Sequence, residues 1–286
     1  MAPTVAILHE LSTAIIQAPG KHGLLPAATS RATAELAAET TYSRSPDWDR
    51  PLADVQSLGG IVLLAAADYG RSFAVLFEGT HAPVYGHLAV ARAALEACVV
   101  AAWLNEPAIE VPERIKRGLR ELVYSAHEEI RLNIDRAAAK HRKSKWKEVA
   151  QSFGWAVTEK DRLPVVDGVG RPSVPDGINK LLVDSAAANI GRAQWSYLSG
   201  VLHVTWYALR QAVETPVESP VGPPLAAVGT DSRSVYAQAV CVIRALRVAA
   251  NRRMTFMGWA DPEWPELCKR VEAHEGVLIR FGVLGG

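Results

Sequence analysis

Apolar residues recur at three- and four-residue spacing along most of the 286-residue chain. This spacing gathers apolar side chains on one face of a helix, whereas strands need strict alternation, which is nearly absent. We therefore predict an all-α fold, a multi-helix bundle. The expected helices are 4–17, 29–41, 52–78, 82–104, 112–139, 144–152, 176–187, 190–214, 232–257 and 262–281.

Two segments do not follow the helical pattern. Residues 154–177 contain several glycines and prolines and could form a short β-hairpin or an extended loop. Residues 214–232 are rich in proline and must be irregular, since proline lacks the N–H that a helix interior needs. Either segment could cover a cavity as a lid. We expect one domain over 1–286, with a core bundle at about 52–257 and helices of 1–45 and 262–281 packed on it.

The charge and cysteine content narrow the class of protein. The chain has 31 Lys and Arg against 30 Asp and Glu, so it has no global field to hold nucleic acid or a membrane. Three widely spaced cysteines form neither a disulfide framework nor a zinc pattern, which favours a reducing cytoplasm. The most apolar segment, 88–104, is short for a membrane span and contains two charges. We expect no membrane association and no cofactor.

The segment 190–214 carries polar residues on a helix that is otherwise apolar. Ser199 and His203 are one turn apart in the middle of a predicted second stripe. A buried imidazole needs partners at both nitrogens, and one serine can satisfy only one of them. His203 is therefore interpreted as a core histidine that joins two helices, as half of a Ser–His pair, or as an acid–base or ligand-binding group.

Two apolar helices contain the charges that could meet this histidine. Arg92 and Glu96 are one turn apart in 88–104, and Asp68 interrupts the apolar run at 61–77. Buried charges of this kind lock helix register or serve a site. Our hypothesis is that Arg92, Glu96 and His203 converge in a dry interior, with Asp68 and Tyr197 nearby. As an alternative, Glu96, Asp68 and His203 could together hold a single metal ion. Our main hypothesis for this centre contains no metal.

Several short segments carry a family resemblance. They are "RAALE" (92–96), "WLNEP" (103–107), "RIKRGLRELVYSAHEEIRLN" (114–133) and "YLSGVLH" (197–203). With them the chain resembles actinobacterial helical proteins of unknown function, which are similar in turn to HEPN-like and abortive-infection helical proteins. The resemblance implies a helical dimer with a role in defence or stress and an action directed at RNA.

HEPN ribonucleases use an arginine and a histidine, separated by four to six residues, on the RNA phosphate and 2′-hydroxyl. Arg120 and His127 have this spacing and project from the same side of a helix, and Arg136 and His141 also match. Both pairs depart from the family because Glu121 and Ala137 stand where a small polar residue is usual. The basic run at 140–147 could bind phosphates and stack a base on its tryptophan, or it could be a solvated helix end.

Two functional hypotheses follow. The first is a HEPN-like, RNA-directed homodimer that uses Arg120, His127 and the run at 140–147. The second is an enzyme or binding protein for a small, largely apolar molecule inside the bundle. In that hypothesis Trp103, Trp195 and Trp206 supply walls, and Arg92, Glu96, Tyr197 and His203 supply polar groups.

Overall fold

The computed structural model describes residues 1–78, 83, 85–133, 135–182, 190–203, 205 and 232–278. These residues form eleven helices and one two-stranded sheet, which confirms the all-α prediction. The helices are α1 (Ala2–Lys21), α2 (Arg31–Ala37), α3 (Glu39–Tyr42), α4 (Pro51–Val75), α5 (Gly86–Leu104), α6 (Val111–Arg131), α7 (Arg136–Ser152), α8 (Val174–Leu182), α9 (Ile190–Leu202), α11 (Ser232–Met257) and α12 (Glu263–Leu278). The strands are β1 (Val157–Lys160) and β2 (Leu163–Val166).

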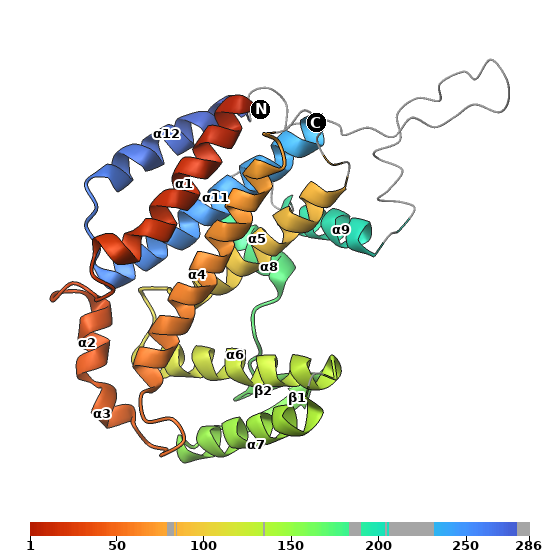
Figure 1. Ribbon diagram of the computed structural model, residues 1–286. Helices are drawn as coiled ribbons and strands as arrows, with labels where there is room; N and C mark the ends of the chain where they lie inside the picture. Colours follow the sequence, from red (N-terminus) through yellow and green to blue (C-terminus); the bar gives the residue numbers. More distant parts are fainter. Residues whose placement is uncertain are drawn as a thin grey trace, which may run out of the picture.

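The long helix α4 is the centre of the bundle. It packs against α1, α5 and α11, and near its beginning it also contacts α6. Figure 1 shows α1, α4 and α11 inclined in similar directions, with α12 outside α1 and with α6 and α7 crossing one end. Helices α8 and α9 cover the side of α5. The architecture thus has one bundle and a smaller layer built across its end.

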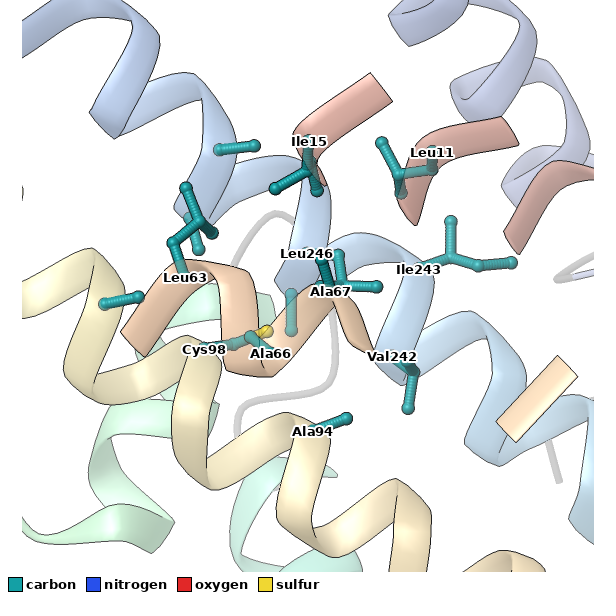
Figure 2. Packing of buried hydrophobic residues seen from close by; sticks show 14 of the residues in the cluster. Leu11, Ile15, Leu63, Ala66, Ala67, Ala94, Cys98, Val242, Ile243 and Leu246 are labelled. Atoms are coloured by element: carbon teal, nitrogen blue, oxygen red, sulfur yellow. The ribbon is translucent and has the colours of Figure 1, made fainter. Parts of the chain in front are cut away.

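The main core lies where α1, α4, α5 and α11 meet (Figure 2). Its labelled members are Leu11, Ile15, Leu63, Ala66, Ala67, Ala94, Cys98, Val242, Ile243 and Leu246. Alanines on α4 and α5 let the two backbones approach closely, and larger residues from α1 and α11 fill the remaining space. Gly70 serves the same purpose, since a Cβ there would lie 2.5 Å from Leu246 Cδ1.

A second core joins the smaller layer to the beginning of α4. It contains Trp48, Leu52, Val55, Leu104, Ile115, Leu119, Val149, Phe153 and Val166, all nearly inaccessible to solvent. Gly118 of α6 lies directly against Val55, and no side chain would fit between them. This contact fixes how α6 crosses α4.

The chain between α6 and α7 departs from the prediction of one helix over 112–139. The helix ends at Arg131, and α7 begins at Arg136. Asn133 and Asp135 have φ of 57° and 38°, a left-handed conformation that asparagine and aspartate tolerate better than most residues. The Asp135 carboxylate then accepts a hydrogen bond from the Ala138 N–H at 3.3 Å and caps α7. The prediction was wrong because apolar spacing continues across this turn.

Residues 157–166 form an antiparallel hairpin, one of the two alternatives expected for the segment 154–177. Val157 pairs with Val166, and Lys160 pairs with Leu163. The two turn residues, Asp161 and Arg162, have φ of 52° and 65°, as a two-residue turn with the twist of the strands requires. The proline-rich segment 214–232 and the expected continuation of α9 beyond 205 lie outside the residues that the structure describes, apart from Ser232.

Helices α4 and α5 are long and apolar enough to cross a membrane by length and composition. Both also pack among several other helices, as core helices of a bundle do, so this finding is weak evidence for a membrane protein. The three cysteines are free thiols. Burial raises the pKa of the Cys98 thiol above its ordinary range and that of Cys241 to about 12.

Candidate functional site

Arg92 and Glu96 form the ion pair expected on α5. Arg92 Nε lies 2.7 Å from Glu96 Oε1, and the two side chains remain 18% and 38% exposed. The Arg92 guanidinium also lies over the Trp195 ring of α9, 4.1 Å from its centroid. Helices α5 and α9 therefore meet at Arg92, but the pair lies at the edge of the bundle and is in contact with solvent.

The other members of the predicted centre do not share a dry interior with this pair. His203 directly follows α9 and is exposed, as is Asp68 on α4. Ser199 and Tyr197 are half-buried, and Tyr197 packs against the main core. Because His203 and Asp68 are exposed, the described part of the chain gives no support to a buried Arg–Glu–His centre.

The metal alternative has no geometric support. Within the described ranges, no three side chains of His, Cys, Asp or Glu gather as a ligand set. Trp206, one of the three expected wall residues, lies outside those ranges. Trp103 is half-buried and lies beneath the Arg117 guanidinium, 5.5 Å from its ring centroid. Of the two expected wall residues that the structure describes, Trp103 contacts Arg117 and Trp195 contacts Arg92.

Arg120 and His127 lie on the same helix but contact different partners. Arg120 is only 4% exposed, and its Nη1 donates to Glu113 Oε1 at 2.8 Å. The Nδ1 atom of the half-buried His127 ring lies 3.3 Å from Lys143 Nζ on α7. The arginine is thus engaged in an internal ion pair, while the histidine lies between α6 and α7.

The basic run at 140–147 forms the exposed side of α7, and much of its charge is compensated. Arg142 pairs with Glu129, Lys143 with Glu159 at 2.9 Å, and Lys145 with Asp47 at 3.5 Å. The Trp146 ring is half-buried and packs edge-on against Trp48, with centroids 5.7 Å apart. Arg136 and His141 are both exposed on this helix. The run resembles a solvated helix side more than a stacking platform.

A group of buried polar side chains that the sequence analysis did not identify connects α2, α4, α5, α6 and α11. We call it the buried polar junction and define it by Glu35, Gln56, Asn105, Arg114 and Arg253, each at most 7% exposed. Buried polar groups need hydrogen-bond partners, and here many of the acceptors are main-chain carbonyls. The junction therefore joins the bundle to its smaller layer.

Arg114 is the most enclosed of these residues, with no exposed surface. Its Nε lies 2.5 Å from Glu35 Oε2, and its two terminal nitrogens donate to the carbonyls of Leu104 and Glu106 at 2.7 and 2.8 Å. The guanidinium also covers the Phe256 ring at 4.0 Å. Burial lowers the pKa of Arg114, and the Glu35 carboxylate partly opposes this shift. Arg114 thus has a carboxylate counter-ion and two main-chain acceptors.

Arg253 is different because it is buried without a carboxylate. Its Nη1 donates to the Gln56 carbonyl at 2.8 Å and to Asn105 Oδ1 at 3.0 Å. Within the described part of the chain, no acidic side chain pairs with it, and Nε and Nη2 have no acceptor. Burial and repulsion from Arg114 lower the pKa of Arg253 to about 10, so the guanidinium remains charged at neutral pH.

A cavity of about 300 Å³ lies beside Arg253, between α1, α4 and the end of α11. Its walls are mainly apolar, and the lining residues are Ile15, Ala18, Pro19, Leu24, Ser57, Gly60, Ile61, Leu63, Leu64, Arg253, Met254 and Trp259. Leu24 and Ile61 are 72% and 64% exposed, so the cavity opens to solvent between α4 and the segment that follows α1. The lining contains no carboxylate, histidine or cysteine.

The sequence did contain a signal for this site. On α11, Leu246, Ala249, Ala250 and Met257 occur at helical spacing and are buried, and Arg253 occupies the same stripe. A charge inside an apolar stripe indicates a buried polar group. Charges and polar groups in the apolar stripes of α5 and α9 were the basis of the predicted site, and the equivalent arginine on α11 was missed.

A larger hollow of about 820 Å³ lies between α1 and α12. Several of its charges already pair across it: Lys21 lies 3.1 Å from Glu263, and Arg270 pairs with Glu10. These pairs leave little uncompensated charge to recruit a ligand. The smaller cavity at Arg253 is therefore the stronger candidate site.

Comparisons of the chain with protein-family models, with curated proteins and with solved structures found no match. The resemblance to HEPN-like proteins stays a prediction.

Proposed function

We propose that this protein binds a small, largely apolar molecule in the cavity between α1, α4 and α11. The observation that carries the proposal is the cavity itself, whose volume lies at the lower end of the range of small-molecule sites. Its lining combines many apolar side chains with few polar groups, as such sites do. Because no carboxylate, histidine or cysteine lines it, the proposal is binding and not catalysis.

Fluorescence of 1-aminoanthracene, an uncharged dye that brightens in apolar surroundings, tests this proposal. The wild-type chain is expected to enhance the dye fluorescence in a saturable manner. Leu64→Trp puts a larger side chain into the cavity and is expected to abolish the enhancement. Ala65→Trp is the matched control, since residue 65 is exposed on the same helix and does not line the cavity. Equal enhancement by both variants would reject this binding site.

The RNA-directed hypothesis remains a second proposal with less support. Arg120 is held by Glu113, and the basic run at 140–147 is largely compensated. Lys140 and Lys147 are exposed and could still contact a phosphate backbone. The expected homodimer belongs to the same hypothesis, and it stays a prediction, as does the cytoplasmic location expected from the cysteine content.

A further inference from the structure

The charge on Arg253 bears on what the cavity can hold. This side chain is 7% exposed, and a buried cation without a counter-ion is costly. Elsewhere in the junction the chain supplies a carboxylate, because Glu35 pairs with Arg114. At Arg253 it supplies two neutral oxygens and leaves the positive charge uncompensated among the described residues.

Arg253 and Gly60 both line the cavity, and the Arg253 nitrogens without an acceptor among the described residues are Nε and Nη2. A Cβ at Gly60 would lie 3.1 Å from Nη2 and 4.0 Å from Nε of Arg253. Because this Cβ would also lie 3.5 Å from Cζ, it would cover the face of the guanidinium at Nη2, and glycine leaves that space free. Nε and Nη2 form the parallel pair of donors that matches the two oxygens of a carboxylate.

The guanidinium is also held in place. Its Nη1 is anchored by Gln56 and Asn105, and its Cζ lies over the Trp259 ring, 5.5 Å from the ring centroid. The indole is fixed in turn, because its Nε1 donates to the Leu25 carbonyl at 2.8 Å. A ligand group would meet donors that are already positioned, which lowers the entropic cost of binding.

We infer that the cavity binds an organic monocarboxylate whose body is apolar, with the carboxylate on Nε and Nη2 of Arg253. This inference rests on the proposed function and specifies its ligand class. The apolar walls select the body of the ligand, and the single cation selects one negative charge. Ligands with a positive charge are excluded by Arg253, and uncharged ligands leave it uncompensated.

Isothermal titration calorimetry with octanoate, 1-octanol and octylamine separates these cases, since the three probes share a chain and differ in the head group. We expect octanoate to bind at least about tenfold more tightly than 1-octanol, as a charge-assisted hydrogen bond allows. Octylamine is expected to bind most weakly. Equal affinities for octanoate and 1-octanol would overturn the inference and leave the proposed function intact. Failure of both probes and of 1-aminoanthracene would overturn both proposals.

Substitution of Arg253 would also remove the bonds of Nη1, so a second variant is needed. Gly60→Ala places a methyl group over Nη2, 3.1 Å from it, and leaves the bonds of Nη1 unchanged. We expect it to lower the preference for octanoate over 1-octanol by about fivefold or more. Gly276→Ala on α12 is the control, because a Cβ there meets nothing within 4 Å. An unchanged preference in Gly60→Ala would contradict the assigned carboxylate position.

Discussion

Replacing Glu35 with Gln removes the charge that compensates the fully buried Arg114. Both side chains are at most 1% exposed, and their charged atoms lie 2.5 Å apart. Loss of one partner of a buried ion pair costs about 3–5 kcal/mol because the other charge stays buried. The amide still accepts a hydrogen bond, so we expect Glu35→Gln to lower the free energy of unfolding by about 2–4 kcal/mol.

Urea denaturation at neutral pH, followed by circular dichroism, measures this change. Glu266→Gln is the control: Glu266 also forms an ion pair, with Lys269, but both side chains are more than 60% exposed. We expect the control to change stability by less than about 0.5 kcal/mol. The double variant Glu35→Leu with Arg114→Met removes both charges and should recover part of the loss. If Glu35→Gln matches the control, the buried pair does not stabilise the junction.

Three further predictions concern other parts of the molecule. Burial alone would raise the pKa of Glu113, but hydrogen bonds from Arg120 and Arg117 outweigh it and lower the pKa. The stabilisation is therefore present above the ordinary carboxyl pKa and is lost as the pH falls. The Tm difference between the wild type and Glu113→Gln should shrink from about pH 5 to about pH 3, and a constant difference would contradict this sign. Of the three thiols, only the half-buried Cys268 should react with a disulfide reagent in the native state, and all three should react in urea. Rapid reaction of more than one native thiol would disagree with the packing. The RNA-directed hypothesis predicts cleavage or salt-sensitive binding of RNA that is lost in His127→Ala, and absence of both activities in the wild type at low salt would reject it.

The positions of the helices could be read from the sequence because apolar periodicity is a local property. The predicted helix at 232–257 matches α11 in both bounds, and the expected helix at 52–78 differs from α4 by one to three residues. The break at 132–135 was missed because the left-handed residues Asn133 and Asp135 interrupt the backbone but not the apolar spacing. Periodicity reports which side of a helix is apolar and does not report the backbone dihedrals between helices.

The site was harder to predict because burial depends on which helices become neighbours. Arg92 and Glu96 do pair, as their spacing required, but Asp68 and His203 point into solvent. Conversely, Arg253 is enclosed by α4 and by the chain around Trp259, contacts that no local pattern encodes. The sequence could identify unusual charges in apolar helices, and tertiary packing decided which of them became buried.

The rim of the cavity joins distant parts of the chain. Trp259 donates to the carbonyl of Leu25 across 234 residues, and the N–H of Ala27 donates to the Met257 carbonyl at 2.8 Å. Contacts of such long sequence separation require the closure of a long loop and form late in folding. The cavity therefore forms only when the first and last thirds of the chain have packed together. A bound ligand should consequently slow unfolding without accelerating folding.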